Sequence, residues 1–274
     1  MADSLSGWLA LREQADSAAR STALTQAIAD KVAHFRPLHV LDLGAGTGSN
    51  LRYLGPRLPG AQRWLLVDDD ARLLAEASGK SARLPARDRL STCAVDTRRL
   101  DLDTLDHPEI FAGRHLITAS ALLDLVSESW LQTLASQCRA IGAVALFALN
   151  YNGQSRCSPA EPEDDVIRHL MNRHQISDKG LGGVAAGPTA VDCAARCFSA
   201  AGYQVRRNVT NWVLTPAERE LQSQLIKGWA HAAEEVAPEE AATIRDWLAR
   251  RLAHIEAGRS NVIIGHEDLG AWLP

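Results

Sequence analysis

Residues Leu38–Gly48 read LHVLDLGAGTG, and this stretch decides the fold. Its first half is a short apolar run, typical of a strand buried in a parallel sheet. The glycines at 44, 46 and 48 then allow a tight turn from strand to helix, and they let a ligand lie against bare backbone. The alternative is a tight turn that binds no ligand. The residues at the ends of the neighbouring strands distinguish these two interpretations.

Four more apolar runs follow, at residues 64–67, 92–95, 115–119 and 143–149. Each ends on a polar residue, namely Asp68, Asp96, Ser120 and Asn150. Helical patterns separate most of the runs, and residues 261–265 give a last strand. The alternation predicts a doubly wound, mostly parallel α/β sheet, with the strand ends and their polar residues along one edge.

We expect residues 1–274 to form a single domain, with an N-terminal helix over 8–34 that ends before Pro37. Residues 151–190, rich in Gly, Pro, Asp and His, predict a helical cap or lid inserted after the fifth strand. Further helices are expected over 162–174, 190–201, 216–233 and 238–257. Residues 203–214 predict one long or broken strand.

The composition excludes several classes of protein. A formal net charge of −4 gives no overall attraction for nucleic acid or an anionic membrane. Five scattered cysteines are typical of reduced thiols rather than a disulfide framework. The N-terminus has no cationic stretch of the kind found in signal peptides, and no run is long enough to span a bilayer. We therefore expect a cytoplasmic protein, and the sequence leaves its oligomeric state open.

The charge of the glycine loop favours a cationic ligand. Asp42 precedes the loop, and a carboxylate there would repel a pyrophosphate but attract a sulfonium ligand that carries an ammonium group. The third glycine is Gly48, whereas the dinucleotide fingerprint places it where Ser49 stands. Both features favour an adenosyl sulfonium over NAD. The missing Gly-Lys-Ser/Thr run excludes a P-loop.

Three stretches together, Val40–Gly48, Leu66–Asp68 and Val95–Asp96, resemble the class I methyltransferases that use S-adenosylmethionine and act on small molecules. The resemblance implies a seven-stranded Rossmann-like sheet whose last strand is antiparallel and lies beside the fifth. It also implies that the glycine loop contacts the amino-acid part of the cofactor, Asp68 the ribose and Asp96 the adenine. The expected cofactor site comprises Asp42, Gly44, Ala45, Gly46, Gly48, Asp68, Asp69, Asp96, Thr97, Ser120 and Arg20. Arg20 would meet the cofactor carboxylate, although ion pairs within a surface helix would explain it equally well.

Methyl transfer from a sulfonium is a direct displacement that needs mainly alignment and the exclusion of water. Asp124 follows the fourth strand and Tyr151 the fifth, so both are candidates for contacts with a small-molecule acceptor. His169 and His174 are five residues apart, off a common helical face, so no metal site is expected. The Asn-Pro-Pro-Tyr signature of nucleobase methylation is absent. An NAD-dependent oxidoreductase, an inactive regulatory protein that binds S-adenosylmethionine and an RNA methyltransferase remain alternatives.

Overall fold

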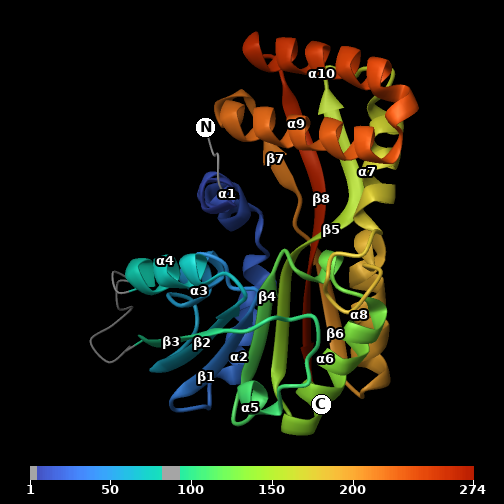
Figure 1. Ribbon diagram of the computed structural model, residues 1–274. Helices are drawn as coiled ribbons and strands as arrows, with labels where there is room; N and C mark the ends of the chain where they lie inside the picture. Colours follow the sequence, from blue (N-terminus) through green and yellow to red (C-terminus); the bar gives the residue numbers. More distant parts are fainter. Residues whose placement is uncertain (1–4, 82–92) are drawn as a thin grey trace.

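The fold is built around one eight-stranded sheet, seen in a computed structural model that describes residues 5–81 and 93–274. Thr92, at the start of a predicted strand, lies outside these ranges. The strand order is β3-β2-β1-β4-β5-β8-β6, and β7 pairs with β8 (Figure 1). The strands are β1 (Leu38–Leu43), β2 (Gln62–Asp68), β3 (Cys93–Arg99), β4 (Leu116–Ser120), β5 (Val144–Ser158), β6 (Gln204–Val209), β7 (Trp212–Leu214) and β8 (Asn261–Trp272). The first five are parallel and β8 is antiparallel, which confirms the predicted doubly wound sheet.

Helices cover both faces of the sheet because alternate strand residues point to opposite sides. Val40 packs with α2 (Thr22–Val32), α3 (Ser49–Leu54) and α4 (Ala71–Ser81). Leu41, the next residue, packs with α5 (Pro108–Phe111), α6 (Glu128–Ile141) and α8 (Ala190–Ala200) on the other face. Among the described residues, no helix is both long enough and apolar enough to cross a membrane.

The N-terminal helix expected over 8–34 is two helices, so that prediction was wrong. The first, α1 (Leu5–Ala19), ends before Ser21, which is the N-cap of α2 and accepts a hydrogen bond from the Leu24 N–H at 3.1 Å. The Ser21 N–H in turn donates to Asp268 at 3.0 Å. The Ser21 N–H therefore bonds outside the helix, and its hydroxyl replaces the backbone acceptor that a continuous helix would give the Leu24 N–H, so the helix is interrupted at Ser21.

Residues 151–158 were expected to open the cap, but they continue strand β5. They stay in the sheet because β8 pairs with them, for example Cys157 with Val262, and β8 itself runs beyond its predicted end at Gly265. Residues 203–214 form the expected broken strand, as β6 and β7. Beyond the main sheet, β5, β7 and β8 form an extension that we call the arm (Figure 1).

The arm has its own helices and its own apolar core. The helices α7 (Asp164–Gln175), α9 (Arg219–Val236) and α10 (Ala241–Glu256) pack there around residues such as Trp229 and Trp247. Short 3-10 turns join the elements: η1 (Leu123–Leu125), η2 (Gly187–Thr189), η3 (Pro216–Glu218) and η4 (Pro238–Glu240). The helical part of the predicted cap is thus a packed unit.

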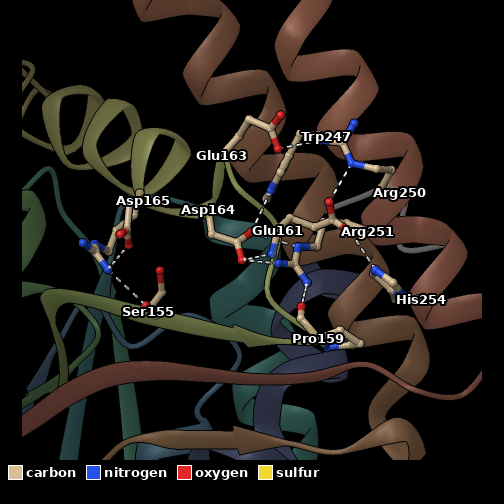
Figure 2. A network of polar contacts seen from close by, with 11 residues as sticks. Ser155, Pro159, Glu161, Glu163, Asp164, Asp165, Trp247, Arg250, Arg251 and His254 are labelled. Carbon is tan, nitrogen blue, oxygen red and sulfur yellow. Dashed lines mark hydrogen bonds and ion pairs between the residues drawn. The ribbon is translucent and has the colours of Figure 1, made fainter.

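An ion-pair network centred on the buried Arg251 joins α10 to the segment that links β5 with α7 (Figure 2). Arg251, with no exposed surface, pairs with Asp164, and its Nη1 donates to the Pro159 carbonyl. The same carboxylate accepts a hydrogen bond from the Trp247 indole at 2.8 Å. Around this pair, Arg250 contacts Glu161 and Glu163, and His254 contacts Glu161. The network fixes α10 to the arm.

Candidate functional site

A cavity of about 520 Å³ lies at the carboxyl ends of the parallel strands, where doubly wound folds bind ligands. Its walls come from the glycine loop, the ends of β2 and β4, the loop after β3, helix α1 and a turn near residue 180. The residues that line it include Leu9, Arg12, Asp16, Gly44, Ala45, Gly46, Asn50, Asp68, Asp69, Asp101, Leu102, Ser120, Leu122, Leu125, Lys179 and Leu181.

The glycine loop presents backbone to this cavity. Gly44 and Gly46 have φ of +62° and +53°, which other residues rarely adopt. A side chain at Gly46 would also come within 3.2 Å of Leu9 on α1. Gly48 faces elsewhere, since a Cβ there would lie 3.2 Å from Ala77 of α4. Gly44, Ala45 and Gly46 thus line the cavity, whereas Gly48 allows α3 to approach α4.

Asp68 is held in a fixed orientation at the end of β2. Its Oδ2 accepts the Gly46 N–H at 2.8 Å, and its Oδ1 accepts the Asp70 N–H at 3.0 Å. Burial raises the pKa of Asp68 despite these two bonds. Asp69 also lines the cavity, while Asp70 accepts the Arg72 N–H at the start of α4. Each carboxylate oxygen of Asp68 keeps a lone pair that can accept a ligand hydroxyl.

Asp96 and Thr97 are not among the residues that line the cavity. They lie in the middle of β3, where Asp96 pairs with Leu65, and both are exposed. The strand was expected to end at residue 95, but its register with β2 continues until Arg99 lies opposite Asp68. The turn that reaches the cavity therefore comes later, and it brings Asp101 and Leu102 to the wall.

Asp42 lies beneath the loop rather than in the cavity wall. It is fully buried, and burial raises its pKa to about 7. Its Oδ1 accepts the Asn50 side-chain N–H at 2.7 Å, and its Oδ2 has no hydrogen-bond partner in the described structure. Asn50 does line the cavity, and its Oδ1 accepts from Arg20 at 2.9 Å. Asn50 therefore links the buried Asp42 carboxylate to the cavity, because its side chain contacts both.

Arg20 is a buried cation with spare hydrogen-bond capacity. Its Nε lies 3.7 Å from Asp268, too far for a hydrogen bond, and neither Nε nor Nη2 has a hydrogen-bond partner in the described structure. Burial lowers the pKa of Arg20, and the neighbouring Asp268 opposes that shift. A small recess lined by Arg20, Asn50 and Ser120 adjoins the cavity. Donors left unpaired in such a place are costly, and a ligand anion would satisfy them.

Asp268 holds the strand ends around this recess, and the sequence analysis missed it. Its carboxylate accepts the N–H of Leu149 at 2.8 Å, the Thr210 hydroxyl at 3.1 Å and the N–H of Ser21. Leu149 has φ +55°, and Ala121, whose N–H donates to the carbonyl of Ala148, has φ +54°. Such backbone is strained in residues other than glycine and is concentrated at functional sites.

Helix α1 covers the cavity without burying a residue of its own. Leu9, Arg12 and Asp16 line the cavity from this side. Polar contacts fasten the helix to three neighbours: Glu13 to Arg52 on α3 at 2.6 Å, Ser6 to Glu76 on α4 at 2.8 Å and Asp16 to Trp212 on β7 at 3.1 Å. These polar contacts and the packing of Trp8, Leu11, Ala15 and Ala19 against the arm hold the cover in place.

Asp124 and Tyr151 are not among the cavity-lining residues. Asp124 lies in η1, between Leu122 and Leu125, which do line the cavity. Tyr151 lies on β5, and its hydroxyl donates to Asn172 of α7 at 2.8 Å. The two predicted acceptor residues are thus neighbours one layer behind the wall.

One turn of the predicted cap, Asp178–Val184, reaches the cavity, through Lys179, Gly180 and Leu181. The Leu181 carbonyl accepts the Ser127 N–H at 3.1 Å, which holds the turn against the start of α6. The Lys179 ammonium donates to the His174 carbonyl at 3.2 Å. This turn therefore brings the positively charged Lys179 to the cavity wall.

Several solved structures are similar to this chain. The YcgJ protein from Bacillus subtilis has 15% sequence identity and a TM-score of 0.48, over 93% of this chain and 100% of that one. A SAM-dependent methyltransferase from Geobacter sulfurreducens, in complex with S-adenosyl-L-homocysteine, has 14% identity and a TM-score of 0.45, over 96% and 98%. The cyclopropane synthase MmaA2 from Mycobacterium tuberculosis has 11% identity and a TM-score of 0.46, over 91% and 83%. No protein-family model and no curated protein sequence matches the chain.

The topology itself defines the fold class. A parallel sheet in the order 3-2-1-4-5, extended by an antiparallel strand that is inserted between the fifth strand and β6, is the arrangement that the resemblance to class I methyltransferases implies. The chain has this Rossmann-like methyltransferase fold, with β7 as an additional strand on β8.

Proposed function

We propose that this chain is an enzyme that binds S-adenosylmethionine and transfers its methyl group to a small molecule. One observation carries the proposal: a single cavity brings together a bare-backbone loop, an oriented carboxylate and, in the adjoining recess, a buried guanidinium with unpaired donors. These three groups complement the amino-acid part, the ribose and the carboxylate of one cofactor. Fold alone would not support this, because one fold serves many functions.

The residues can be assigned to parts of the cofactor. Asp68 would accept hydrogen bonds from the ribose hydroxyls, and Asp101 with Leu102 would replace Asp96 beside the adenine. Arg20 would bind the carboxylate through its unpaired donors, and Asn50 would orient the ammonium end with Asp42 behind it. The bound cofactor supplies an electrophilic methyl group on a positively charged sulfur.

Most of what the protein does for such a reaction is positioning. The α1 cover and the glycine loop hold the two sides of the cavity together and exclude water, and alignment of reacting atoms lowers the barrier to displacement. Arg12, Asp16 and Ser120 lie where α1 meets the end of β4, and we propose this end as the acceptor side. The Asp178–Val184 turn would close it with Lys179, the part of the expected lid that the geometry supports.

Calorimetry tests the cofactor assignment. Purified protein should bind S-adenosylmethionine and S-adenosylhomocysteine with one site per chain and should bind NAD much more weakly. The structural reason is that Asp42 and Asp68 place carboxylates at the glycine loop, where a pyrophosphate would be repelled. A preference for NAD would replace this proposal with an oxidoreductase, the alternative that the sequence left open.

A further inference from the structure

A buried carboxylate stands behind the acceptor side of the cavity with unused bonding capacity. Asp124 is 7% exposed, and its Oδ1 has no hydrogen-bond partner in the described structure. It is carried by η1, whose flanking residues Leu122 and Leu125 line the cavity, and the strained Ala121 immediately precedes that wall. An unsatisfied buried carboxylate is costly, so its retention here needs a reason.

The groups around Asp124 come from several elements. Arg12 of α1 is close enough to favour the charged form, and the Tyr151 N–H of β5 supports it, yet burial dominates and raises the pKa of Asp124 to about 6. His266 of β8 pairs with Tyr151 across the strands, and burial lowers its pKa to about 3, so it is uncharged near neutral pH. Burial also raises the pKa of the Tyr151 hydroxyl, which stays protonated.

The remaining elements that pack on η1 bring charges that are already paired. Helix α8 contacts η1, but its Asp192 pairs with Arg207 and its Arg196 with Glu128. Asp16 of α1 is bound to Arg12 and to the Trp212 indole. Among the described groups near η1, Asp124 is thus the carboxylate with an unsatisfied oxygen.

We propose that Asp124, directly behind the cavity wall, accepts the proton of the methyl acceptor, which is therefore an O–H or N–H compound. This inference rests on the proposed function. The acceptor oxygen or nitrogen bonds to the methyl carbon, the electron pair of the broken C–S bond stays on sulfur, and the acceptor proton passes to Oδ1 of Asp124. A sulfonium cation and a carboxylate both become neutral, which a low-dielectric site favours.

Arg12 of α1 lines the cavity and its charge acts on Asp124; it is bound to Asp16, and its guanidinium lies 5.0 Å from the Trp212 ring centre. Trp8, Leu11, Ala15 and Ala19 of α1 pack against the core of the arm, and a movement of the Arg12 side chain alone leaves these apolar contacts in place. An acceptor that displaces the guanidinium would reach Oδ1.

The test uses the charge difference between the two cofactor forms and needs no acceptor. S-adenosylmethionine carries a sulfonium charge that S-adenosylhomocysteine lacks, and both share every other group that ionises. If Asp124 faces that charge, the sulfonium lowers its pKa, so the preference for S-adenosylmethionine increases as the pH rises through about 6. We expect the ratio of the two dissociation constants, measured by calorimetry at pH 5 and 7.5, to change by about fivefold, which is the change that a lowering of the pKa from about 6 by one unit produces between these pH values.

Two variants make the result specific. Asp124→Asn, which keeps the size of the side chain and removes its charge, should give a ratio that does not change with pH. Asp42→Asn removes another buried carboxylate of raised pKa and should keep the wild-type change in ratio. A ratio that is independent of pH in the wild type, or one that loses its pH dependence in Asp42→Asn instead, overturns the role of Asp124. Failure to bind either compound would refute the cofactor assignment itself.

Discussion

Replacing Arg20 by lysine separates its role toward a ligand from its role in the fold. Lysine keeps a positive charge beside Asp268 but has no planar fork, so it cannot serve Asn50 and a ligand carboxylate together. The variant avoids the penalty of an unpaired buried Asp268 that Arg20→Met would create. A charge-assisted hydrogen bond is worth about 1.5–3 kcal/mol. Loss of one such bond predicts S-adenosylhomocysteine affinity weaker by about 10- to 150-fold.

The ligand provides the control for this prediction. 5′-Methylthioadenosine has the adenosine and the thioether but no carboxylate, so its affinity should be unchanged in Arg20→Lys. Arg57→Lys is the matched protein control, because Arg57 stacks on the same Tyr53 ring as Arg20, at 4.0 Å from its centre, but does not line the cavity. Equal weakening of both ligands would show that Arg20 supports the fold rather than the carboxylate, and unchanged binding of both would refute its role.

Three further outcomes are expected. Asp68→Ala should weaken S-adenosylhomocysteine binding by about 2–4 kcal/mol in calorimetry with an unchanged far-UV spectrum, because two oriented acceptors are lost; an unchanged dissociation constant would make Asp68 a turn residue. The pKa of Asp42 is raised from 3.8 to about 7, so between these pH values the folded state holds a proton that the unfolded state has lost. The free energy of unfolding therefore falls as the pH rises through this range. Urea unfolding at pH 5 and 8 should show a smaller fall in Asp42→Asn than in the wild type. Arg251→Met should lower the free energy of unfolding by about 3 kcal/mol, the lower end of the range for breaking a buried pair, since Asp164 is partly exposed; S-adenosylhomocysteine affinity measured below the transition should not change.

The sequence predicted the sheet well because strand signals and strand ends are local. Gly44 and Asp68 lie where a strand-to-turn transition places them, and the apolar runs before them mark those transitions. Asp96 shows the limit of this method: the end of β3 is set by its pairing with β2, and the exposed edge strand carries no apolar signal after Val95. The turn that reaches the cavity, at Asp101, could not be located without the register.

The buried polar residues were harder to predict, although some left a signal. Asn50 occupies a helix position one turn before Leu54, on the buried side of α3, so a polar residue at an apolar position indicated a function. Asp268 continues the alternate positions of Val262 and Ile264 in β8, and extending the predicted strand would have placed it in the core. The arm as a unit left no such signal, because two stretches that lie far apart in the chain, residues 148–175 and 212–264, come together to build it.

Because the arm shares strands β5 and β8 with the main sheet, it cannot move independently of the cofactor site. This coupling restricts the routes by which ligands can enter. Strands β5 and β8 run without interruption from the main sheet into the arm, and β8 carries His266 beside Tyr151 and Asp268 beside Arg20 on the same face. The Arg251–Asp164 pair then fixes α10 to the arm. A lid that swings on residues 151–190 would have to break strand pairing and this buried pair together. Helix α1 is held by three polar contacts and by the packing of Trp8, Leu11, Ala15 and Ala19 against the arm, so its displacement breaks neither strand pairing nor the Arg251–Asp164 pair. We therefore expect the cofactor and the acceptor to enter beneath α1 rather than beneath the arm.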